Sequence, residues 1–177
     1  MRITAIVALT AAALLSGCAA TVSRDSAQTA AVSASPQASK RVLLEISAVG
    51  SIGSGADWDA FVEEWQTSMT AAAATSGATF TMVKPGSQSP TDAAVLVKMK
   101  VNDFKYVSQA KRYAVGIFAG NAFMDIEVEY VELPPGKALG KRKFQTSSSA
   151  WQGVFSAMTP KQVEAVAKEI LADLSSK

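Results

Sequence analysis

Two stretches of this sequence alternate between apolar and polar residues, a pattern that requires a sheet covered on one face only. In the first stretch, Val95, Val97, Met99 and Val101 alternate with Lys98, Lys100 and Asn102. The second stretch is DIEVEY at 125–130, and a PPGK turn at 134–137 separates it from a further strand predicted at 139–146. In an antiparallel meander, the acidic strand lies between two basic strands. Each cross-strand pair of opposite charges then adds roughly 0.2–1 kcal/mol.

The segments around this meander predict two more strands and a helix. The nearly continuous apolar segment 41–49 is typical of a strand covered on much of both faces, and a short strand follows at 78–83. Between them, apolar residues from Trp58 to Ala73 recur at spacings of three and four, which indicates an amphipathic helix. We expect Ser54 or Asp57 to cap its N-terminus and Gly77 to take the left-handed position after its C-terminus.

The last predicted helix has the clearest start signal. Thr159-Pro160-Lys161-Gln162 combines a capping box with proline at the first helical position, and one apolar stripe then runs from Val163 to Leu174. The predicted element order is therefore β-α-β-β-β-β-α. This order predicts an α+β two-layer sandwich, in which a mostly antiparallel sheet of about five strands carries two helices on one face.

The N-terminus carries an uncharged apolar run from Ile3 to Leu15, which suits a signal peptide and is short for a spanning helix of about 20 residues. The run leads into Leu15-Ser16-Gly17-Cys18, which resembles the lipobox of bacterial lipoproteins. The resemblance implies that residues 1–17 are removed, that the Cys18 thiol carries a diacylglycerol and that its amine carries a fatty acid such as palmitate. Ala19, where a retained lipoprotein has Asp, implies sorting to the outer membrane with the domain in the periplasm.

Residues 18–39 are small and polar after the cysteine and contain no aromatic side chain. They predict an acylated cysteine followed by a flexible linker with a reach of roughly 25 Å. Residues 40–177 are then predicted to form a single periplasmic domain, because this length suffices for one hydrophobic core.

The composition excludes several classes of chemistry. Histidine is absent and Cys18 is the only cysteine, so Ser-His-Asp and Cys-His catalysis and imidazole metal ligands are excluded. We therefore expect no catalytic residue, no metal and no cofactor apart from the covalent lipid. With 17 basic and 15 acidic side chains, the net charge of +2 gives no electrostatic case for nucleic acid. Asp59 and Glu63 could hold a hard cation or act as an acid/base pair, or they could simply stabilise the start of their helix.

The stretch RYAVGIFAGNA at 112–122 precedes a strand and a turn that contains Gly136-Lys137. It resembles the glycine-rich segment of a family of uncharacterised bacterial lipoproteins, domain of unknown function 4410, although Pro135 departs from the usual Thr-Gly-Lys turn. The resemblance spans roughly residues 41–174 and implies a fold and a lipid anchor. It implies no catalytic residues, because the family has no established activity. The element order is also similar to the periplasmic domains of curli-secretion lipoproteins and of lipoproteins that activate penicillin-binding proteins.

Three interpretations of the apolar segment 114–124 stay open. It is a tight backbone passage between strands, an exposed loop that docks a partner or another copy, or a segment that inserts into a bilayer as in a pore-forming assembly. Trp151 belongs to a second apolar patch, which either fills the gap between the last helix and the sheet or borders a binding groove. The candidate contact residues are Gly116, Ile117, Phe118, Gly120 and Trp151.

These observations together predict a membrane-anchored periplasmic lipoprotein that is not an enzyme. We expect it to bind an envelope protein or to assemble with itself. The alternatives are a carboxylate-dependent ligand-binding, metal-binding or enzymatic domain, and a subunit of a pore or secretion assembly.

Overall fold

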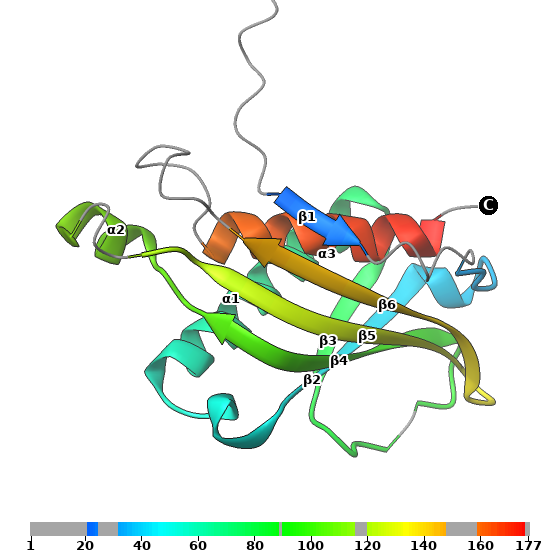
Figure 1. The fold of residues 1–177 in the computed structure, drawn as a ribbon. Helices are drawn as coiled ribbons and strands as arrows, with labels where there is room; N and C mark the ends of the chain where they lie inside the picture. Colours follow the sequence, from blue (N-terminus) through cyan, green and yellow to red (C-terminus); the bar gives the residue numbers. More distant parts are fainter. Residues whose placement is uncertain (1–20, 25–31, 89, 116–119, 148–158, 176–177) are drawn as a thin grey trace, which may run out of the picture.

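The structure of this protein is a computed structural model, and it describes residues 21–24, 32–88, 90–115, 120–147 and 159–175. Within these residues, two long helices cover one face of a six-stranded sheet, and a short helix extends from one end of that sheet (Figure 1). The predicted α+β fold with two layers is confirmed. No helix in the described part of the chain is long and apolar enough to cross a membrane.

The sheet has the strand order β1-β6-β5-β4-β2-β3. Its strands are β1 (Thr21–Arg24), β2 (Arg41–Ala48), β3 (Thr79–Val83), β4 (Ala94–Lys105), β5 (Phe123–Leu133) and β6 (Lys137–Ser147). The predicted antiparallel meander is formed by β4, β5 and β6, and β1 pairs antiparallel with β6. At the opposite edge of the sheet the pairing is parallel, because β2 runs in the same direction as both β3 and β4.

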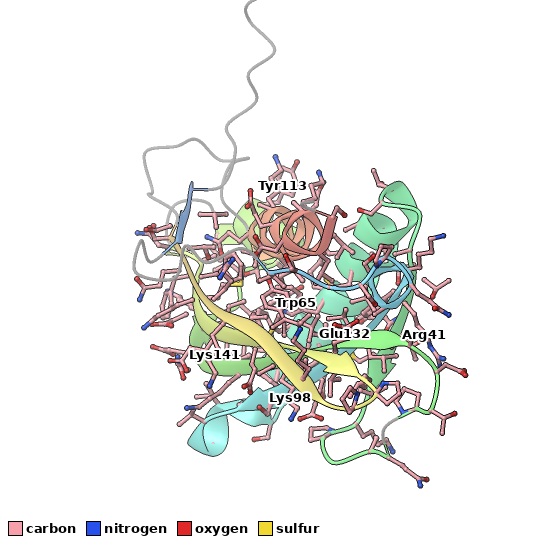
Figure 2. The ribbon with its side chains drawn as sticks, turned by 90° about the vertical axis from the view of Figure 1, so that its right-hand side faces the viewer. Arg41, Trp65, Lys98, Tyr113, Glu132 and Lys141 are labelled. Carbon is pink, nitrogen blue, oxygen red and sulfur yellow. The ribbon has the colours of Figure 1, made fainter. Side chains whose placement is uncertain are left out.

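The helices are α1 (Ala56–Thr75), α2 (Gln109–Val115) and α3 (Thr159–Ser175), and two short 3-10 turns are η2 (Ala38–Lys40) and η3 (Gly50–Gly53). The helices α1 and α3 lie side by side over the sheet (Figure 1). Trp65 of α1 and Ile170 of α3 meet Val97 and Ile126 of the sheet in one buried cluster. Figure 2 shows Trp65 between the helices and the strands. Burying each such side chain stabilises the fold by roughly 1.5–3 kcal/mol.

Both ends of α1 depend on glycine. Gly55 is the N-cap at a φ of 90° and no side chain caps the helix, so the predictions for Ser54 and Asp57 are wrong. The reason is local: the Ser54 hydroxyl donates to the carbonyl of Ser51 at 3.1 Å. At the other end Gly77 has a φ of 68°, which confirms the predicted left-handed residue.

The capping box predicted at the start of α3 is wrong. Thr159 and Gln162 are both fully buried. Their side chains bond to backbone groups on either side of α2, and not to each other's backbone. The start of α3 packs against the end of the sheet, so these two polar groups find partners there instead of in their own helix.

The element order differs from the prediction at two places, β1 and α2, and β1 lies in the segment predicted to be a flexible linker. Residues 32–39 of that segment also pack on the domain: Val32 is 1% exposed and Ala38 is fully buried. Val32 belongs to the buried core and lies over the helix-covered face of β6, where its Cγ2 would be 3.5 Å from a Cβ placed on Gly140. The residues described between 18 and 39 are therefore part of the fold.

A buried polar cluster ties the C-terminal half of α3 to the sheet. The Tyr130 hydroxyl donates to Oδ2 of Asp173 at 3.1 Å, and Nε of Arg142 lies 3.4 Å from the same oxygen. The side chains of Arg142 and Asp173 are only 8% and 10% exposed. Because a buried carboxylate is costly without partners, this pairing fixes how α3 sits on β5 and β6.

Candidate functional site

One end of the sheet carries the described residues that precede and follow positions 116–119 of the glycine-rich segment, and we call it the tip. The strand register places Lys105, Phe123, Ser147 and Thr21 in one row across β4, β5, β6 and β1. The helix α2 lies between Lys105 and Phe123 in the chain, so it extends from this row, away from the body of the domain (Figure 1). We define the tip as this row together with α2.

The base of the tip is held by the start of α3. The Thr159 hydroxyl accepts a hydrogen bond from the backbone N–H of Val107 at 2.9 Å and lies 3.4 Å from the carbonyl of Lys105. On the other side, Nε2 of Gln162 donates to the carbonyl of Ala122 at 3.1 Å. Val107 and Ala122 are both 1% exposed and pack together. The chain therefore enters and leaves the tip through two fixed points.

The outer part of the tip exposes apolar side chains. Among the described residues, the exposed large hydrophobic side chains are Tyr113 (58% exposed), Val115 (45%) and Val49 (45%), and the first two are on α2. Ala114 between them is exposed as well. An exposed apolar run at a projecting end makes α2 a candidate contact surface.

The contact residues predicted from the sequence fall largely outside the described residues: this applies to Gly116, Ile117, Phe118 and Trp151, and also to Cys18. Their contact role stays a prediction. Gly120 is described, with a φ of 73°. A Cβ at this position would lie 2.6 Å from Nζ of Lys105. The Lys105 side chain is flexible and could move aside, but the positive φ would strain any other residue, which accounts for the glycine as a turn into β5.

Opposite the helices, the sheet presents rows of charges that follow the predicted pattern. Glu45, Lys98, Glu129 and Lys141 face each other across four strands, and Figure 2 shows Lys98 and Lys141 on the side away from α3. Nζ of Lys141 lies 3.6 Å from Oε1 of Glu129. Exposed pairs of this kind stabilise a protein by about 0–1 kcal/mol each, so we assign the rows to strand pairing and not to a binding site.

Asp125 is the most strongly hydrogen-bonded carboxylate of this face. Burial pushes the pKa of Asp125 up, but hydrogen bonds from Gln145 at 2.9 Å and Asn102 at 3.3 Å, together with Lys143 at 3.3 Å, outweigh this effect. The net result is a pKa below its ordinary value. The carboxylate is thus held in its charged form, which suits a structural role.

An open groove of about 870 Å³ runs between α1 and α3 on the surface. Its walls consist mainly of small side chains, among them Thr67, Ala71, Thr75, Ser76, Ala172 and Ser175. Charged side chains also line it: Lys168 pairs with Glu164 at 2.6 Å. Burial raises the pKa of Glu64, and the nearby Glu164 adds to the rise, whereas a hydrogen bond from Ser68 opposes it.

Asp59 and Glu63, the two carboxylates that the sequence suggests as a cation site, are joined by no third acidic ligand among the described residues. Asp59 and Glu63 both lie on exposed positions of α1. Within the part of the chain that the structure describes, no group of three or more acidic or cysteine side chains is placed to hold a metal ion. The structure thus gives no support to a hard-cation site on this helix.

Sequence reasoning missed Tyr113 and Val115 as site residues, because it treated the region around them as one continuous glycine-rich segment. The helix α2 has only 7 residues, which is too short for an apolar periodicity to show. The run of good helix formers from Gln109 to Ala114 was the available signal.

No protein-family model and no curated protein matches this chain. Similar folds are found among solved structures. PelC from Paraburkholderia phytofirmans, a dodecamer, has 12% sequence identity, and the match covers 89% of this chain and 98% of PelC. The TM-scores are 0.51 for a single-residue variant of PelC and 0.50 for a second crystal form. A Xanthomonas campestris protein of the DUF330 family matches at 13% identity over 81% of this chain and 90% of its own, with a TM-score of 0.44. At these identities the similarity to PelC establishes a shared fold.

Proposed function

We propose that this protein is a lipid-anchored protein of the bacterial cell envelope that acts by assembling with copies of itself, and not by catalysis. The observation that carries the proposal is the fold shared with PelC over nearly the full length of both chains, since PelC is a dodecamer. The lipobox-like sequence that ends at Cys18 supports the anchor, and Ala19 after it favours the outer membrane with the domain in the periplasm. The absence of histidine from the sequence supports a role in binding.

The groove between α1 and α3 is the surface that we assign to contact between copies. It is wide, open and lined by small side chains, so backbone and side chains of a neighbour can approach the two helices closely. Glu164 and Lys168 at its side supply both signs of charge, which favours a defined orientation of the neighbour. The alternative is that the tip contacts a different envelope protein through the residues predicted from the sequence.

The anchor is tested by Cys18→Ser. Several buried acyl chains contribute about 0.8 kcal/mol per methylene, so the native protein is expected in the membrane pellet. The variant is expected in the soluble fraction, provided that it is still exported. Retention in the pellet at the native level of a Cys18→Ser protein whose intact mass shows that residues 1–17 are removed would contradict the anchor.

Assembly is tested by native mass spectrometry and light scattering of the full-length lipidated protein in detergent. We expect a homo-oligomer that Ala71→Arg dissociates, because position 71 lines the groove. Ala74→Arg is a matched control, since Ala74 is an equally exposed alanine of the same helix outside the groove lining. A monomeric native protein would overturn the proposal. Crosslinking in cells distinguishes the alternative, which predicts a second protein in stoichiometric amount.

A further inference from the structure

The position of β1 determines which end of the domain lies close to the lipid anchor. Cys18 precedes Thr21 by three residues, so a fully extended chain places it at most about 11 Å away. Thr21 lies opposite Ser147 in the tip row. The other end of the sheet is a full strand away, since β6 has 11 residues and therefore spans roughly 35 Å. An anchor at Cys18 thus reaches the tip and not the β5–β6 hairpin.

The side chains of the tip suit the surface of a bilayer. Tyr113 and Val115 are exposed there, and tyrosine favours the membrane–water interface because its ring is apolar and its hydroxyl is polar. Lys105 is exposed in the same row, where its ammonium group can attract anionic lipid headgroups. Thr159 accepts a hydrogen bond from the Val107 N–H and Gln162 donates one to the Ala122 carbonyl, and these two bonds hold the base of the tip from which α2 extends.

A seven-residue helix would bind a bilayer only weakly by itself. The anchor changes this, because it keeps the helix beside the membrane and makes the second contact intramolecular. No new folding is needed, since α2 is already formed in the domain. The two contacts together would hold the domain in one orientation instead of leaving it to move freely on a long tether.

We propose that the tip, with Tyr113, Val115 and Lys105, rests on the lipid bilayer in which Cys18 is anchored, so that the strands of the sheet point toward the membrane. This inference rests on the lipid anchor of the proposed function. In this orientation the groove between α1 and α3 opens to the side of the domain. A neighbouring copy anchored in the same membrane can therefore meet it.

The test uses the full lipidated protein in vesicles of phosphatidylethanolamine and phosphatidylglycerol. The Cys18 thiol is consumed by the anchor, so one engineered cysteine can carry an environment-sensitive fluorophore. Val115→Cys reports on the tip, and Ala138→Cys is the control, because Ala138 is exposed at the opposite end of the sheet. Spin-labelled headgroup lipid is expected to quench the probe at position 115 and to leave the probe at position 138 bright.

The outcomes distinguish failure of the proposed orientation from failure of the proposed lipid anchor. A protein that floats with the vesicles but shows no quenching at position 115, or equal quenching at both positions, overturns the orientation and leaves the anchor intact. A protein that carries no lipid and does not float overturns both. Insertion of about 15 Gly and Ser residues between Cys18 and Thr21 is a further test, since it lengthens the reach beyond the tip. Quenching at position 115 is expected to fall in this variant, and unchanged quenching would contradict the role of the short connection.

Discussion

Thr21 lies directly opposite Ser147 in the antiparallel pair of β1 and β6. Because of this pairing, the segment that follows the predicted lipid attachment site in the chain is part of the sheet. The pairing also fixes the place where the chain leaves the domain toward Cys18.

Val22→Asp is expected to detach β1 from β6. Val22 is half-buried against the core, and a carboxylate there would lose hydration without gaining a partner. Hydrogen exchange measured by mass spectrometry should become faster at residues 21–24, with a cost in stability of about 1–3 kcal/mol. Ser23→Asp is the control, because Ser23 is exposed. Equal exchange in the native protein and Val22→Asp would show that β1 does not depend on this contact.

Thr159→Val is expected to loosen the base of the tip. It leaves the N–H of Val107 buried without its acceptor, which costs about 1–3 kcal/mol. The loss is measured as a lower midpoint in urea, with faster hydrogen exchange at residues 106–108. Thr159→Ser keeps the hydroxyl and should retain most of the stability. If Thr159→Val unfolds at the native midpoint, the hydrogen bond to Val107 does not hold the base of the tip.

Asp173→Ala is expected to be strongly destabilising, because it leaves the Arg142 guanidinium buried without its carboxylate. Removing one partner of a buried ion pair costs about 3–5 kcal/mol. Urea unfolding monitored by circular dichroism gives the change in the free energy of unfolding. Lys168→Ala breaks the exposed pair with Glu164 on the same helix, and should cost only about 0.3–0.5 kcal/mol. Similar losses in the two variants would contradict the buried character of the Asp173 cluster.

The lowered pKa of Asp125 predicts that the stability of the fold depends on pH. Its pKa in the folded protein lies below the ordinary value of 3.8, so the unfolded chain binds a proton more readily than the fold does. The stabilisation is present above pH 3.8 and is lost as the pH falls through the lower folded value. Asp125→Asn should therefore lose less stability than the native protein on acidification. Asp103→Asn, at the exposed position opposite Asp125, is the control, and a native-like acid response in Asp125→Asn would refute the assignment.

The alternating segments were sufficient to predict the meander and its rows of charge, because a side-chain period of two fixes both the faces and the register. Lys98 and Glu129 therefore meet as expected. The buried face of α1 was equally clear, since Trp65 and Met69 belong to a long run with helical spacing. In both cases many residues repeat one pattern, and tertiary packing agrees with the local preference.

The two missed elements are too short to carry a pattern. The strand β1 has 4 residues and exists only because β6 offers it an edge.

The residues Thr159 and Gln162 show a different limit of sequence-based prediction. Their spacing fits a capping box, but their burial against the tip gives them other partners. The candidate contact surface shares this difficulty. Exposure of Tyr113 and Val115 depends on where α2 ends up in the fold, which local sequence does not encode.

The strand β1 also shields an edge of the sheet. It pairs with the last four residues of β6, which would otherwise be unpaired on that side. An uncovered strand of this length is a template for pairing with other chains. Cleavage by a protease between β1 and Val32 would separate the domain from the predicted lipid attachment site at Cys18 and also allow β1 to leave. The released fragment would then aggregate edge to edge, whereas a Cys18→Ser protein, which keeps its covering strand, would stay dispersed.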